Sequence, residues 1–164
     1  MVLKHFEEID LPHAIEHLVY EISMLEAVAA RLSKFQHGDV KNALVESLAL
    51  HTRNLIEFYF YSEGGKDDDL RAVQFCKPET TWPHNRSTLN SLQVLSDAAG
   101  RANKQVSHLT LDRGQKASHG KGWPTDELLT ALRIVHEEFR TLARPEVLVA
   151  LDEKMPPIIH QVRN

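Results

Sequence analysis

The chain has a single cysteine, Cys76, so no disulfide can form within it. It has no apolar run close to the ~18 residues that cross a bilayer. Its first ten residues carry Glu7, Glu8 and Asp10 in place of the apolar core of a signal peptide. These absences argue against a secreted or membrane protein, and we expect a protein of the cytoplasm with no membrane association.

Glycine and proline are also scarce, at seven residues each, which argues against a fibrous or disordered chain. A length of 164 residues and a hydrophobic content of 42% suit one domain, which we predict over residues 1–164. The net charge of −4 argues against indiscriminate binding to nucleic acid. Residues 101–122 differ, because five basic residues stand there against Asp112 alone, a local balance of +4.

Helical periodicity dominates the remaining pattern and predicts an all-α fold, a four-to-five-helix up-and-down bundle. We expect an ordered Pro/Trp loop over residues 77–86 and a basic, glycine-containing loop over residues 111–123. The main helices are expected between start and stop signals: from Asp10 to Gly38, from Asp39 to Tyr61, from Ser87 through a bend at Gly100 to about Leu109, and from Thr125 to Pro145. Short helices are expected before Phe75 and Pro156.

Two of these helices have distinct apolar patterns. The first carries a regular seam with steps of three and four residues, formed by Ile15, Leu18, Ile22, Leu25, Ala29 and Leu32. The second is apolar on nearly all sides, which is typical of a buried helix. Its polar residues are therefore informative, because buried polar groups need partners.

A basic stripe on the third helix is the best candidate for chemistry. Arg101 and His108 are seven residues apart, so they share one helix face about two turns apart, with Lys104 between them. Arginine can grip a phosphate in bidentate fashion, and histidine can transfer protons near neutral pH. Two structural interpretations stay open: Asp97 pairs with Arg101 on an exposed face, or His108 satisfies the last carbonyls of a helix.

A second polar group, His51, Arg53 and Asn54, lies on the apolar second helix. One interpretation is a core histidine beside an Arg53–Glu57 pair, because buried charges are normally paired. The functional alternative is that this face meets the Arg101–His108 stripe, so that polar groups from two helices share a cleft.

The segments HTRNLIEF and NKQVSHLT, with Arg101, Asn103 and His108, resemble the HEPN superfamily of helical nucleotide-binding domains. Its signature is an arginine, a polar residue, a few variable residues and a histidine. Active members cleave RNA without metal, with the ribose 2′-hydroxyl as nucleophile. The resemblance implies that His108 is the acid/base group, that Arg101 stabilises phosphorane charge and that Asn103 orients them.

The resemblance also implies partners and a setting. Lys104, Arg113 and Lys116 would contact RNA, and His51, Arg53 and Asn54 would support the site. Members are often homodimers, with the site assembled across the dimer, and work in toxin–antitoxin or antiviral systems with a partner protein.

Two other functions stay open. One is a non-catalytic helical module that binds other proteins, and the other is a metal-dependent bundle enzyme. His13 and His17 have the i, i+4 spacing of a metal-binding pair, but neither HExxH nor the ExxH pairs of carboxylate-bridged bundles are present. We interpret this pair as a solvated face and expect no metal or other cofactor.

Overall fold

The computed structural model describes residues 6–60, 69–106 and 122–155, apart from the side chains of Arg86 and residues 104–106. Within these ranges the fold is all-α, as predicted. The α-helices are α1 (Leu11–Leu32), α2 (Asp39–Tyr59), α3 (Arg86–Ser91), α4 (Gln93–Val106), α6 (Thr125–Leu142) and α7 (Pro145–Lys154). Two short 3-10 helices, η1 (Phe6–Glu8) and η2 (Ala72–Phe75), complete the described elements.

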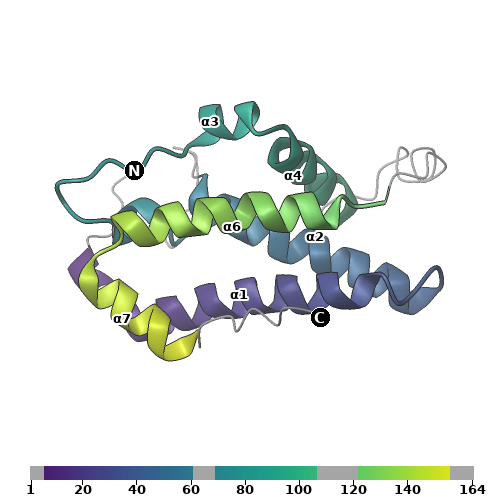
Figure 1. The fold of residues 1–164 in the computed structure, drawn as a ribbon, viewed down its shortest axis with the longest axis horizontal. Coiled ribbons are helices and arrows are strands. Elements are labelled where there is room, and N and C mark those ends of the chain that lie inside the picture. Colours follow the sequence, from purple (N-terminus) through teal and green to yellow (C-terminus); the bar gives the residue numbers. More distant parts are fainter. Residues whose placement is uncertain (1–5, 61–68, 107–121, 156–164) are drawn as a thin grey trace, which may run out of the picture.

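The helices form a bundle around α2. In Figure 1, α6 runs across the middle of the molecule, with α1 below it and α3 and α4 above it. Helix α2 packs against both α1 and α4, and α7 turns back to pack against α1. The expected Pro/Trp loop is ordered, because Trp82 is 5% exposed and its indole Nε1–H donates to the carbonyl of Tyr59 at 2.7 Å.

Helix α1 begins and packs as its sequence predicts. The Asp10 side chain accepts a hydrogen bond from the backbone N–H of His13 at 3.4 Å, and proline occupies the first turn. The predicted seam faces the core: Ile15, Leu18, Leu25 and Leu32 are buried, and Ile22 and Ala29 pack partly buried against them.

Helix α2 differs from its prediction in two respects. Its N-cap is Gly38, whose φ of +96° suits glycine, so Asp39 is the first helical residue instead of the cap. Its buried residues all lie in the second half, from Leu48 to Tyr59, and Val40 in the first half is 53% exposed. The second half also has an open side, because Leu50 is 42% exposed. In Figure 1 the first turns of α2 reach past α4 and α6 and lie beside α1 alone.

The predicted third helix is two helices. Asn85, not Ser87, caps α3, and its side chain accepts hydrogen bonds from the backbone N–H groups of Ser87 and Thr88. The chain leaves helical geometry at Leu92, where ψ is 82°, and α4 then runs through Gly100. The break therefore falls at Leu92, and Gly100 lies inside a helix.

The end of the chain also departs from expectation in detail. Helix α6 ends at Leu142, three residues before Pro145, and Pro145 begins α7. The backbone of Cys76 forms an isolated antiparallel bridge with Ala143, which ties the η2 region to this corner. Among the described residues, no helix is long and apolar enough to span a membrane.

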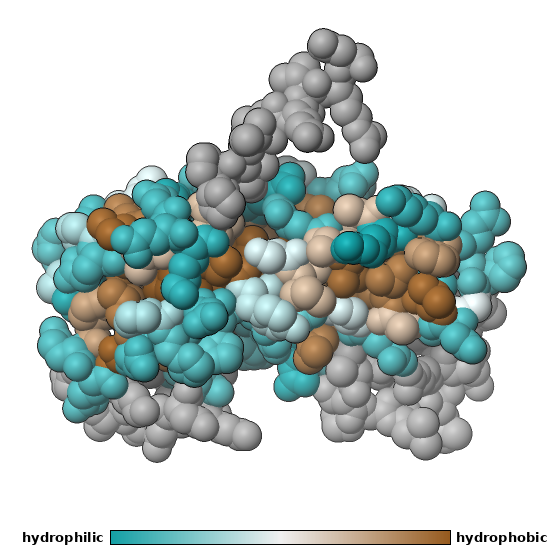
Figure 2. All heavy atoms as spheres, turned by 90° about the horizontal axis from the view of Figure 1, so that it is seen from below, coloured by the Kyte–Doolittle hydropathy of each residue, from teal (hydrophilic) through white to brown (hydrophobic). Residues whose placement is uncertain are grey.

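Apolar side chains also reach the surface. Figure 2 shows the molecule from below, and on that face hydrophobic residues form patches along a middle band, bordered by hydrophilic ones. The large hydrophobic side chains with the highest exposure include Tyr20 at 52%, Ile134 at 64% and Val149 at 58%. They come from three helices, so surface exposure of apolar groups is not confined to α2.

Candidate functional site

Arg101 anchors the candidate site where α4 approaches the start of α6. Its guanidinium lies over the indole ring of Trp123, 4.5 Å from the ring centroid. Its Nη1 donates to the backbone carbonyl of Gly122 at 3.3 Å. We call Arg101, Gly122 and Trp123 the clasp, because they hold the two chain ends that flank residues 107–121 together.

The electrostatics of the clasp are those of a partly buried cation. Burial lowers the pKa of Arg101, and the negative charge of Asp97, one turn earlier on α4, raises it. Asp97 itself accepts a hydrogen bond from Gln93 at 2.8 Å. Arginine keeps its charge at any physiological pH, so a permanent cation sits on an aromatic face here.

Trp123 brings a second polar feature to the clasp. The residue is 9% exposed, and its indole Nε1–H is buried without a hydrogen-bond partner among the described residues. The backbone carbonyl of Trp123 accepts from both the N–H and the hydroxyl of Thr125, at 2.8 and 3.1 Å, which fixes the entry into α6. The backbone at Trp123 is therefore held in place, and its indole has one donor that no described residue uses.

The other members of the predicted stripe are only partly placed. Asn103 is exposed on α4, and at ~100° per residue it lies about 200° around the helix from Arg101. The two side chains therefore point to opposite sides of α4. Lys104 lies in α4, but its side chain is outside the described part of the structure, and so are His108, Arg113 and Lys116. Their proposed roles stay predictions.

The polar residues of α2 do not gather at the clasp. His51 is 4% exposed, and its Nδ1 lies 2.7 Å from the Glu21 carboxylate of α1, with the ring of Tyr20 edge-on at 5.8 Å. It is thus a core histidine at the α1–α2 contact, with a carboxylate partner on another helix. Arg53 is half-buried and Asn54 is exposed.

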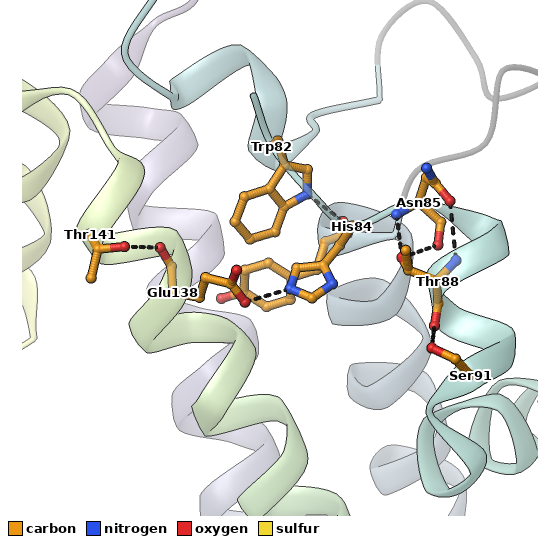
Figure 3. Close-up of polar contacts among 8 residues, drawn as sticks. Trp82, His84, Asn85, Thr88, Ser91, Glu138 and Thr141 are labelled. Carbon is orange, nitrogen blue, oxygen red and sulfur yellow. Dashed lines mark hydrogen bonds and ion pairs between the residues drawn. The ribbon is translucent and has the colours of Figure 1, made fainter. Parts of the chain in front are cut away.

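Sequence reasoning missed a second polar cluster, between α6 and the Pro/Trp loop. Figure 3 shows the imidazole of His84 pointing to Glu138 of α6, at 2.8 Å from Nε2 to the carboxylate. Its ring centroid lies 5.0 Å from those of Phe60 and Trp82, and its Nδ1 is buried without a partner among the residues that the structure describes. The only signal in the sequence is a histidine beside Trp82-Pro83.

A neutral histidine lies next to this cluster. The hydroxyl of Tyr59 lies 2.7 Å from Nδ1 of His136. Burial, and to a smaller extent the charge of Arg140, lowers the pKa of His136 to about 4. Burial raises the pKa of Tyr59, so the phenol keeps its proton and donates it to Nδ1. His136 therefore carries its own proton on Nε2 at neutral pH.

These two clusters are separate. Trp123 precedes the first residue of α6, whereas Glu138 is thirteen residues after Thr125, which is about 20 Å along a helix. The His84–Glu138 pair ties the Pro/Trp loop to α6, which is a structural role. The clasp is the part of the described structure that joins a cation, an aromatic face and an unused donor.

Comparisons with family models, with curated proteins and with solved structures found no match to this chain. The clasp and the predicted stripe are therefore interpreted from their own chemistry.

Proposed function

We propose that this chain binds RNA through residues 101–122, with the clasp as the rigid base of the site. The observation that carries the proposal is the half-buried guanidinium of Arg101 on the indole of Trp123. Arginine recognises phosphate, and the buried indole of Trp123 holds the guanidinium in place from one side.

The chemistry proposed for this site is metal-independent cleavage, as the resemblance implies. The ribose 2′-oxygen attacks the adjacent phosphorus, and the bond from phosphorus to the 5′-oxygen breaks. His108 moves the protons, one removed from the 2′-hydroxyl and one delivered to the leaving 5′-oxygen, and Arg101 stabilises the phosphorane. The products are a 2′,3′-cyclic phosphate and a 5′-hydroxyl, which identify the reaction.

Arg101→Ala is expected to weaken binding of a labelled single-stranded RNA about tenfold and to reduce the slope of log affinity against log salt by about 0.7. The affinity falls because the variant lacks one phosphate contact, made by a guanidinium that Trp123 holds in position. Fluorescence anisotropy at several salt concentrations measures both quantities. The affinity of Arg101→Lys for RNA should lie between those of the unaltered chain and Arg101→Ala. Lysine keeps the positive charge but cannot make the two parallel hydrogen bonds of a guanidinium.

Arg31→Ala is the matched control for this prediction. Arg31 is exposed near the end of α1 and donates to the carbonyl of Ala27 at 2.9 Å, so its removal changes the net charge equally, away from the clasp. Equal losses of affinity in both variants would show that binding is a general charge effect and would refute the assigned site.

His108→Ala is expected to reduce cleavage of RNA about a hundredfold or more, with RNA affinity retained, because it removes the proton-transfer group. Gel analysis of labelled RNA in excess chelator measures the rate, and His37→Ala is the control because His37 is exposed in the loop between α1 and α2. Binding without any cleavage by the unaltered chain would leave an RNA-binding domain and remove the nuclease chemistry.

The proposal includes a homodimer in solution or a complex with a partner protein. A molar mass of twice that of the chain, measured by light scattering, would support the homodimer. A non-catalytic interaction module is the second candidate, favoured by exposed apolar side chains such as Tyr20, Val40 and Leu50. A folded chain that binds no RNA would select this second function.

A further inference from the structure

Two histidines on the first turns of α1 face each other across one helical turn. His13 and His17 are both exposed, and their Nε2 atoms lie 3.0 Å apart. The ring centroids are 4.3 Å apart, with the planes at 79°. The contact is a hydrogen bond between the two Nε2 atoms, one of which carries the proton in this arrangement. When both imidazoles carry their proton on Nδ1 instead, both Nε2 lone pairs are available to one ion.

The surrounding charge favours a cation at that point. Residues 6–30 contain no lysine or arginine, and their charged residues are all carboxylates: Glu7, Glu8, Asp10, Glu16, Glu21 and Glu26. Three of them pair with cations from other elements, Glu7 with Arg144, Glu16 with Lys154 and Glu26 with Arg133. Asp10, the N-cap carboxylate, lies one turn before His13 and offsets the positive end of the helix dipole there.

The geometry points to a two-imidazole binding site for a divalent transition metal at His13 and His17. With metal–nitrogen bonds of about 2.0–2.1 Å, a nitrogen separation of 3.0 Å corresponds to an angle of about 95° at the metal. Both side chains are exposed and can rotate to the separation that a given ion needs. The preference among ions then follows the general order for nitrogen ligands, in which copper(II) binds more tightly than nickel(II) or zinc(II).

The site has protein ligands for only part of a coordination sphere. Among the described residues there is no group of three or more histidine, cysteine or acidic side chains that could hold a metal. Water completes the sphere, so the ion is exchangeable and binds more weakly than at a closed structural site. The site is on α1, whereas the clasp is formed by α4 and the two residues Gly122 and Trp123 that precede α6, so this inference is independent of the proposed RNA chemistry.

Isothermal titration of the full chain with copper(II), nickel(II) and zinc(II) tests the site. We expect binding in the order copper, nickel, zinc, and a copper spectrum in electron paramagnetic resonance that shows coupling to two nitrogens. His17→Ala and His13→Ala should each weaken copper binding at least tenfold. His37→Ala is the matched control, because it removes another exposed histidine and should leave the affinity unchanged.

A thermal measurement gives a second readout. An ion that binds both His13 and His17 stabilises the start of α1, because the two imidazoles are close together only in the folded helix. Nickel should therefore raise the Tm of the unaltered chain and leave the Tm of His17→Ala unchanged. Equal copper affinity in the control and the His13→Ala, His17→Ala double variant would overturn the assignment. Loss of copper binding in the double variant would support this site whether or not the unaltered chain binds RNA.

Discussion

Phe139→Ala is expected to lower the free energy of unfolding by about 3–5 kcal/mol, one of the two largest effects that we predict. Phe139 is fully buried in the middle of the bundle. Its ring centroid lies 5.6 Å from that of Phe58, 6.0 Å from Tyr59, 5.9 Å from Trp82 and 6.2 Å from His136. Truncation would leave a cavity between α2, α6 and the Pro/Trp loop that rigid rings cannot fill.

Chemical denaturation followed by circular dichroism measures this loss. Ile134→Ala on the same helix is the control, because Ile134 is 64% exposed and its removal should change stability by less than about 0.5 kcal/mol. Similar losses in both variants would mean that α6 contributes through its helicity alone and that the aromatic centre is not the core of the fold.

The existence of the helices could be predicted because each is long and bounded by local signals. In α1, Asp10 and the proline that follows it act on the backbone within one turn, and the seam from Ile15 to Leu32 fixes the buried face. Tertiary contacts only confirm such a helix. Local chemistry was therefore enough to place α1.

The structure departs from the sequence-based prediction in two situations. In one, contacts between distant residues determine what is buried, and in the other, two local signals compete for the same helix end. Val40 and Leu50 are as apolar as the residues of a buried helix, yet they are exposed because no described part of the chain covers them. Asn85 and Ser87 are both good caps, and Asn85 prevails with a reciprocal bond from its N–H to the Thr88 hydroxyl at 2.8 Å. The break at Leu92 had no proline or glycine to mark it.

The candidate site could be predicted only in part. The pattern identified Arg101 as the important cation, but its stacking on Trp123 joins residues on either side of a long segment, and no periodicity connects them. The same holds for His84 and Glu138, which come from a loop and from α6. Asn103 was chosen by its place in a motif, whereas the helix angle sets it on the other side of α4 from Arg101.

Stability is expected to fall by about 3 kcal/mol through His136 as the pH drops from about 6.5 to about 4. The folded chain binds a proton at His136 only near pH 4, because burial lowers its pKa from 6.5. The unfolded chain binds that proton near pH 6.5. Between these values the unfolded state holds more protons, so the free energy of unfolding rises with pH there. The contribution of His136 to the free energy of unfolding is therefore fully present above about pH 6.5 and is lost as the pH falls towards about 4.

His136→Gln separates this titration from those of the other acidic and histidine groups. Glutamine offers the Tyr59 hydroxyl an acceptor but binds no proton, so the drop in unfolding free energy between about pH 7.5 and about pH 4.5 should be smaller by about 2–3 kcal/mol than in the unaltered chain. His37→Gln, at an exposed position, should keep the full drop. Because Tyr59 holds Nδ1 from a buried position, the ring resonances of His136 should also stay constant until the pH approaches 4. An ordinary titration near pH 6.5 would show that the imidazole reaches solvent, and the buried Tyr59–His136 bond would then be refuted.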